Sequence, residues 1–212
     1  MEETNKNFIL IDHPLIKRDV TVLRDNKTTP ETFRAAISRI SNIIAVKLSK
    51  DFEITETDVK TPLEKTTGYK LALEVVIVPV LRAGLGMVNG FLQIMPNAKV
   101  GHIGLERDEK TLEPIEYYYK TPDNLSKHKI ILVDPMLATG GSASAAISFL
   151  KKRGAGNIIF ACIVAAPEGI KRIMNDHPDV KIFGAALDRE LNAKGYILPG
   201  LGDAGDRTFG TL

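Results

Sequence analysis

Residues 128–147 read HKIILVDPMLATGGSASAAI, and this stretch decides the fold class. A run of apolar β-formers ends on a carboxylate at Asp134, and Thr139-Gly140-Gly141-Ser142 then precedes small residues that suit a helix. A strand that is apolar throughout is typical of a parallel sheet with both faces covered, since neither face meets water. The stretch therefore predicts a buried strand, a tight turn and a helix.

The same alternation of strands and helices continues from about residue 73 to 187. Strand-like segments occur at 73–81, 98–105, 128–133, 157–166 and 180–187, and helical segments at 83–95, 142–153 and 167–178. The proline-bounded PIEYYYKTP (114–122) is rich in aromatic β-formers and predicts a hairpin strand. We therefore expect an α/β fold with an open, mostly parallel sheet flanked by helices, and a β-hairpin arm near 105–122.

The two ends of the chain differ from this core. Residues 31–50 place apolar side chains three and four positions apart after the start signal Thr29-Pro30, which predicts an amphipathic helix. The tail is rich in glycine, so we expect it to form no regular element. We predict a single domain over 1–212, made of a core at about 31–187 and a small hood at about 1–30 and 188–212.

Composition excludes several classes of protein. The 212 residues carry a net charge of +2, which gives no case for a nucleic-acid or anionic-membrane surface. The longest apolar run is too short to span a bilayer and the polar N-terminus is unlike a signal peptide, so a cytoplasmic protein is expected. The one cysteine, Cys162, lies in an apolar run and is expected to be a buried hydrophobe. The four histidines show no metal-ligand spacing, which argues against a structural zinc.

The stretch after Asp134 has the chemistry of a site for a phosphorylated sugar. Ligands of an open parallel sheet bind beyond the carboxyl ends of its strands, where Asp134 is predicted to stand. The glycines allow backbone N–H groups to form an anion nest, and the helix that follows adds its positive N-terminus. Asp134 would repel a phosphate, so we expect it to accept from sugar hydroxyls. The alternative is a plain helix start capped by Thr139 or Ser142.

Three stretches resemble a known family. IILVDPMLATGGSA (130–143) resembles the phosphoribosyl-diphosphate (PRPP) motif of type I phosphoribosyltransferases. VPVLRAGLGM (78–87) and GYILPGLGDAGDRTFGT (195–211) are similar to signatures of the uracil phosphoribosyltransferases. Weaker similarities at 12–25, 104–118 and 167–174 extend the match over nearly the whole chain. The tail signature is the most specific, because relatives that use other bases share the PRPP motif.

The resemblance implies transfer of the 5-phosphoribosyl group of PRPP to uracil in pyrimidine salvage, giving UMP and diphosphate. Arg82 and Arg107 would bind the diphosphate end of PRPP and, with Asp203, are the expected catalytic residues. Ile197, Gly202, Asp203 and Ala204 would hold uracil. The remaining PRPP contacts would come from Asp134, Pro135, Met136, Leu137, Ala138, Thr139, Gly140, Gly141 and Ser142.

Physical chemistry favours these roles independently of the family, except for Arg107. Its charged surroundings at 106–110 would without the family indicate a solvated loop, whereas the resemblance implies a lid over the site. Arg82 interrupts an apolar strand–helix junction, which is an unusual place for a surface charge. A diphosphate leaving group gains charge as its bond to ribose breaks, so fixed guanidinium groups and Mg²⁺ aimed at it lower the barrier. Gly200, Gly202 and Gly205 would allow the backbone to approach the uracil edge and read it by hydrogen bonds.

The resemblance also implies a cofactor and partners. Many type I members have two adjacent acids where this chain, like the uracil-specific members, has Asp134-Pro135. Mg²⁺ is therefore expected to bind with PRPP, near Asp203, rather than to a protein site alone. A homodimer or homotetramer is implied. GTP is a candidate effector, because some relatives respond to it and no motif here decides the matter.

Two alternative functions stay open at this point. A UMP-sensing, RNA-binding regulator on the same fold would need a basic face, and the interspersed charges speak against one. A purine phosphoribosyltransferase would lack the GLGDAGD loop at 200–206.

Overall fold

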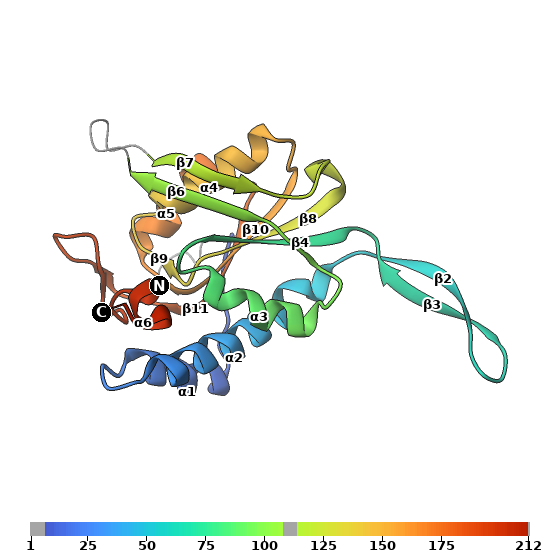
Figure 1. The fold of residues 1–212 in the computed structure, drawn as a ribbon, viewed down its shortest axis with the longest axis horizontal. Helices are drawn as coiled ribbons and strands as arrows, with labels where there is room; N and C mark the ends of the chain where they lie inside the picture. The colour runs from blue at the N-terminus through green and yellow to red at the C-terminus, as the bar shows by residue number, and fades with distance from the viewer. Residues whose placement is uncertain (1–6, 108–113, 212) are drawn as a thin grey trace.

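The structure, a computed structural model, describes residues 7–107 and 114–211, and the side chains of residues 107 and 114 lie outside this description. Its framework, within these residues, is a nine-stranded sheet (Figure 1). The strands along the sheet are β1 (Phe8–Leu10), β11 (Lys181–Leu187), β10 (Asn157–Ala165), β8 (His128–Val133), β4 (Glu74–Leu81), β6 (His102–Arg107) and β7 (Pro114–Lys120). Two short strands complete it, β5 (Lys99–Val100) beside β4 and β9 (Met136–Leu137) beside β10. All pairings are parallel except that of β6 with β7.

Helices cover both faces of the central strands β4, β8, β10 and β11, which explains why these strands are mainly apolar. Alternate side chains of a strand point to opposite faces, so Val75 and Ile77 of β4 join one core and Val76 and Val78 join the other. The first core packs under α1 (Pro14–Arg24), α2 (Pro30–Leu48) and α3 (Leu85–Ile94), and the second under α4 (Gly141–Lys152) and α5 (Pro167–Asp176) (Figure 1). The predicted α/β fold with an open, mostly parallel sheet is confirmed.

The start of α2 follows the predicted signal. Thr29 is the N-cap residue, its hydroxyl accepts from the Thr32 N–H at 3.3 Å, and Pro30 occupies the first turn, where no backbone N–H is needed. The fully buried carboxylate of Asp19 on α1 binds Arg18 and, through both oxygens, Arg39 of α2. This ion-pair cluster fixes α1 against α2.

The tail contains regular structure, so the expectation that it forms none is wrong. Two strands, β12 (Glu190–Leu191) and β13 (Ile197–Leu198), pair antiparallel, and α6 (Ala204–Phe209) follows them. The carboxylate of Asp203 accepts from the Asp206 N–H at 2.9 Å and caps α6, which ends at Gly210 with φ of 72°. At the other end of the chain, β1 pairs in parallel with β11 and so extends the main sheet.

Two of the antiparallel pairs in the described residues are longer hairpin arms, and one of them was predicted. The antiparallel pair β6–β7 forms the expected arm at the edge of the sheet. The other hairpin, β2 (Ile54–Lys60) with β3 (Lys65–Leu71), projects away from the body of the molecule (Figure 1). Its side chains are exposed on both faces, so its sequence lacks the apolar pattern of a covered strand. Short 3₁₀ turns precede β2 and β8, at Ser49–Asp51 and Leu125–Lys127.

Two further expectations concern single features of the chain. Cys162 lies in the middle of β10 and is fully buried, and burial raises the pKa of its thiol well above the usual range. It is therefore an inert hydrophobic side chain, as predicted. Among the helices that the structure describes, none combines the length and the apolar character that a bilayer crossing requires.

Candidate active site

Arg82 and Asp134 stand at the same edge of the sheet. Arg82 directly follows β4 and Asp134 directly follows β8, and these two strands are parallel neighbours, with Pro79 opposite Val133. The carboxyl ends of both strands therefore open toward one crevice, the usual place for a ligand in an open α/β sheet. The chain crosses this edge a third time at the start of α6, where Asp203 lies.

A cavity of about 210 Å³ joins these three segments. It is lined by Val80, Leu81, Arg82, Ala83, Leu105, Asp134, Ser142, Asp203 and Gly205. Four of the predicted site residues thus meet in one place although they come from three separate parts of the chain.

Arg82 is held toward α6 by an ion pair. Its Nη2 lies 3.0 Å from Oδ1 of Asp206, whose pKa is lowered by the hydrogen bond from Thr211 and by this guanidinium. The Arg82 side chain is still 57% exposed, so its other N–H donors face solvent and the cavity. A guanidinium fixed at one side and open at the other can accept an anion with little rearrangement. Asp206 was not among the predicted site residues. It lies three positions after Asp203, the spacing of a helix N-cap and its N3 residue, and this spacing could have indicated the start of α6.

The partly buried carboxyl of Asp134 has a raised pKa. Burial raises the pKa of its carboxyl to about 7, the Met136 N–H at 3.2 Å opposes the rise, and the Asp203 carboxylate adds to it. Two carboxylates therefore share the cavity, and near neutral pH Asp134 exchanges between its neutral and ionised forms.

The glycine-rich turn before α4 leaves its helix start without a side-chain cap. The N-cap residue is Gly140, with φ of 78°, so the alternative in which Thr139 or Ser142 caps the helix is wrong. Thr139 Oγ1 instead accepts a long hydrogen bond of 3.4 Å from the Gly141 N–H. A Cβ on Gly140 would lie 2.9 Å from the Gly169 carbonyl oxygen, so packing as well as φ requires glycine. An uncapped helix start with a left-handed residue is suited to an anion.

The uncapped turn opens into a second cavity, of about 830 Å³, between α4 and α5. Thr139, Gly141 and Ser142 line it on one side. Its charged lining is mixed, with Lys152 and Arg172 beside Glu106 and Asp176. Ser142 lines both cavities, so an anion on the turn would lie next to a ligand in the smaller cavity.

The other predicted PRPP residues lie below the turn. Met136 and Leu137 form β9 beside β10, and the Pro135 carbonyl oxygen accepts from Ile163 and Val164. They support the turn from the sheet and do not line the smaller cavity. Ala138 lies against α5, where its carbonyl oxygen would be 2.5 Å from a Cβ on Gly169. The predicted contact by the side chain of Arg107 lies outside the described residues.

The predicted uracil residues surround the start of α6. Ile197 and Ala204 are buried in the core, so a base could meet Ile197 through its backbone only. Gly202 and Asp203 are exposed at the mouth of the site. Gly202 has φ of 80°, a conformation that glycine adopts readily and other residues rarely.

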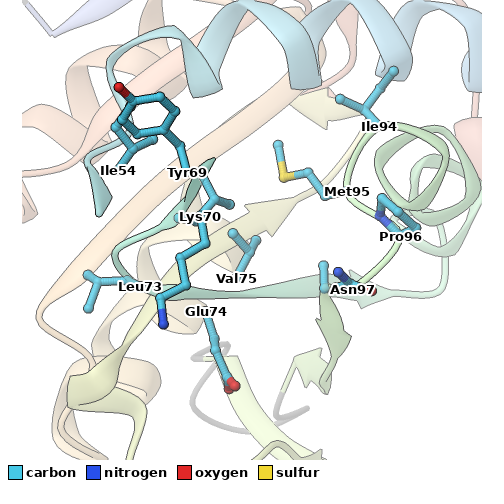
Figure 2. A pocket seen from close by; sticks show the side chains of 12 residues that line it. Ile54, Tyr69, Lys70, Leu73, Glu74, Val75, Ile94, Met95, Pro96 and Asn97 are labelled. Carbon is cyan, nitrogen blue, oxygen red and sulfur yellow. The ribbon is translucent and has the colours of Figure 1, made fainter. Parts of the chain in front are cut away.

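A cavity of about 600 Å³ lies at the opposite end of β4, at the base of the β2–β3 hairpin (Figure 2). Figure 2 shows Tyr69 and Ile54 of the hairpin across from Ile94 and Met95 at the end of α3. It is larger than the cavity at Asp134 but lies at the amino end of the strand, far from the glycine-rich turn. Its lining is mainly apolar, which suits a protein contact better than a phosphorylated ligand.

Comparison with known proteins finds similar chains over almost the whole length of this one. The family model described as "Uracil phosphoribosyltransferase" matches residues 10–211. Curated proteins of that name are 52% identical in Salinibacter ruber, over 97% of this chain and 98% of the relative, and 56% identical in Finegoldia magna, over 95% and 97%. A solved structure from Aquifex aeolicus superposes with a TM-score of 0.90 at 39% identity, covering 95% of this chain and 97% of that one.

A more distant solved structure shows the fold alone. Adenine phosphoribosyl transferase from Trypanosoma brucei, in complex with AMP, pyrophosphate and ribose-5-phosphate, has a TM-score of 0.60 at 14% identity, covering 88% of this chain and 86% of that one. The family model and the curated relatives, by contrast, span almost the entire chain. On this evidence, the chain belongs to the uracil phosphoribosyltransferase family.

Proposed function

We propose that this chain transfers the 5-phosphoribosyl group of PRPP to uracil, giving UMP and diphosphate in pyrimidine salvage. The observation that carries the proposal is the cavity that joins Arg82, Asp134 and Asp203 beside the uncapped start of α4. Membership of the family supports the same reaction.

The phosphorylated ribose would occupy the edge of the sheet between Asp134 and α4. The 5-phosphate would sit on the backbone N–H groups of the turn 138–142, where the helix start favours negative charge. Ionised Asp134 would accept from the ribose hydroxyls next to it, and Pro135, Met136 and Leu137 would keep the turn in place. A built anion site next to a carboxylate suits a ligand that carries both a phosphate and free hydroxyls.

The diphosphate end would meet Arg82, with Arg107 as its second cation. The leaving group gains negative charge as its bond to the ribose carbon breaks, and a guanidinium already in place stabilises that charge without reorganisation. The ribose carbon becomes oxocarbenium-like, so the fixed positions of base and leaving group decide the rate.

Mg²⁺ fits this donor set only as a partner of the substrate. Within 7–107 and 114–211 no three His, Cys, Asp or Glu residues cluster as a metal site, and the cavity offers two carboxylates. Mg²⁺ commonly binds through one or two carboxylates plus substrate phosphates. Asp203 would hold it together with diphosphate oxygens and water, and the ion would neutralise charge on the leaving group.

Uracil would bind at residues 200–204, which we call the base loop, with Ile197 beside it. The exposed backbone of Gly202 and Asp203 and the approach to Ala204 would present donors and acceptors to the edge of the ring. Uracil has one donor, at N3, between two carbonyl acceptors, and a fixed backbone can match that pattern.

A panel of bases tests the proposal. Purified protein is mixed with PRPP, Mg²⁺ and one of uracil, cytosine, adenine, guanine or hypoxanthine, and nucleotide formation is measured. We expect uracil to give UMP and the other four bases to give no nucleotide. A purine nucleotide as the main product, or no nucleotide together with salt-resistant RNA binding, would support the alternative functions instead.

Self-association, GTP control and a cytoplasmic location complete the proposal. The β2–β3 hairpin carries exposed apolar side chains, among them Leu63 at 95% exposed, and it borders the mainly apolar cavity of Figure 2. Covering them in a homodimer or homotetramer would remove apolar surface from water. Light scattering gives the mass of the assembly, with and without GTP.

The pH dependence of PRPP use should follow Asp134. Because only ionised Asp134 accepts from ribose hydroxyls without donating, kcat/KM for PRPP should rise with pH through an apparent pKa of about 7. Asp134→Asn should abolish this rise with pH. It should also lower kcat/KM about 10- to 100-fold at pH 8, because one charge-assisted hydrogen bond is lost. Steady-state rates between pH 5.5 and 9 measure both effects.

The same substitution should leave the fold intact. The pKa of Asp134 is raised in the folded chain, so its proton stabilises the fold at low pH, and this contribution is lost as the pH rises through about 7. A neutral asparagine avoids the cost of the buried charge, so the Tm at pH 8 should not fall. Unchanged kcat/KM in the variant would remove Asp134 from the site.

A further inference from the structure

The base loop is held by side chains that do not face the base. Gly200 donates its N–H to Oδ2 of Asp188 at 2.8 Å, and its carbonyl oxygen accepts from Nη1 of Arg24 at 2.8 Å. The next carbonyl oxygen, that of Leu201, accepts from Nη1 of Arg207 at 2.7 Å. Three backbone groups of Gly200 and Leu201 are thus bonded to charged side chains just before Gly202 and Asp203.

These charges are themselves anchored in the body of the protein. Asp188 follows β11 at the carboxyl edge of the sheet, is 6% exposed, and donates its backbone N–H to Ala165 of β10 at 2.8 Å. The Arg24 guanidinium donates hydrogen bonds to both carboxylate oxygens of Asp188, at 2.9 and 2.5 Å. Arg24 lies at the end of α1, so this pair connects the sheet, α1 and the loop.

Arg207 makes a second connection to the same end of α1. Its guanidinium is buried, lies 4.5 Å from the ring centre of Phe33, and also donates to the carbonyl oxygens of Leu23 and Asp25. A buried cation that hydrogen-bonds to backbone carbonyls is costly to desolvate. Its hydrogen bonds to the three carbonyl oxygens offset that cost and connect the base loop to the end of α1.

The loop needs this support because glycine leaves it free. Gly200 has φ of 64°, and a Cβ there would lie 2.2 Å from the carbonyl oxygen of Ile197, so only glycine fits. Gly202 has φ of 80°, and a Cβ added to it would lie 3.5 Å from Cδ of Arg207. A segment with two such residues loses much entropy when it is ordered, unless other groups order it before the ligand arrives.

We propose that Arg24, Asp188 and Arg207 are positioning residues that preorganise the base loop and thereby set the affinity for the pyrimidine base far more than the affinity for PRPP. The inference rests on the proposed function, because it takes the base loop as the uracil site. Neither guanidinium lines the cavity at Asp134 and Arg82, and Asp203 is the one residue of the base loop that does, so PRPP binding should depend on them much less than uracil binding.

The test compares Arg24→Met and Arg207→Met with Arg39→Met as a matched control. Arg39 binds the buried Asp19 through two hydrogen bonds on the same helix pair but does not touch the loop. Both loop variants should raise KM for uracil about tenfold or more, with KM for PRPP changed less than twofold. The control should lower the Tm and change neither KM. Hydrogen exchange in the peptide covering the base loop should be faster in the loop variants only.

The outcomes separate this inference from the proposed function. A parent enzyme that forms no UMP from uracil would contradict the function itself. If the parent is active, two results would overturn the positioning role. One is a lower Tm of the loop variants with an unchanged KM for uracil, and the other is an equal rise in the KM values for uracil and PRPP. If Arg207→Met does not fold, Arg24→Lys is the deciding variant. The Arg24 side chain is 28% exposed, and a lysine there keeps the positive charge but cannot bind both Asp188 and Gly200 as the guanidinium does.

Discussion

Cytosine should be converted with a kcat/KM about 10⁴-fold below that of uracil if, as proposed, the base loop recognises the edge of the ring by backbone hydrogen bonds. The two bases have the same size and shape, so steric exclusion cannot separate them. In cytosine the C4 oxygen becomes an amine donor and N3 becomes an acceptor. A backbone N–H that faces C4 would then meet a donor, and a carbonyl that faces N3 would meet a lone pair.

The size of this effect follows from the rigidity of the loop. Each unpaired buried polar group costs about 1–3 kcal/mol, and a loop held by Arg24, Asp188 and Arg207 cannot turn to offer other groups. 5-Fluorouracil keeps the edge of uracil and should be used, which makes it the control for ring binding. Initial rates with the three bases at saturating PRPP measure the ratio. Comparable turnover of cytosine would contradict backbone recognition even if the reaction is confirmed.

Arg82→Ala should lower kcat/KM for PRPP by about 10²-fold or more, on the scale of removing one donor from a developing anion. Arg82 follows β4 at the edge of the cavity, and its ion pair with Asp206 fixes the guanidinium before the substrate arrives. The loss should appear in kcat as well as in KM, because the charge on the leaving group is greatest in the transition state. Steady-state kinetics with PRPP as the varied substrate measure it.

Two further variants define what Arg82 does. Arg82→Lys should recover only part of the loss, since an ammonium group replaces a planar fork with a point charge. Arg18→Ala is the control: Arg18 is 56% exposed, against 57% for Arg82, and also binds an aspartate, but it lies on α1 away from the cavity. A lysine variant as active as the parent would exclude bidentate binding of the diphosphate.

The sequence by itself determined the core of the fold. The apolar runs at 75–80, 130–133 and 158–165 are strands because they are covered on both faces, and burial on both sides is what makes a strand apolar throughout. Thr29-Pro30 predicted the start of α2 because a helix cap depends on neighbouring residues only. The β2–β3 hairpin was missed since exposed strands leave no such pattern.

Local rules that were present in the tail were outweighed by its composition. The cap at Asp203 and the left-handed stop at Gly210 both mark α6, yet the glycines around them favoured an irregular segment. In the structure those glycines supply the turns on either side of the helix, and the buried Ile197, Leu201 and Ala204 attach it to the core.

Only the tertiary structure decided how the site is assembled. The sequence placed Asp134 at a strand end before a glycine-rich turn, and this was possible because strand, turn and helix are contiguous. That Arg82 and Asp203 share its cavity depends on β4 lying next to β8 and on the tail returning across both strand ends. The pKa of about 7 at Asp134 and the support of the base loop by Arg24 and Arg207 have the same origin. Burial, charge and hydrogen bonding between distant segments exist only once the chain has folded.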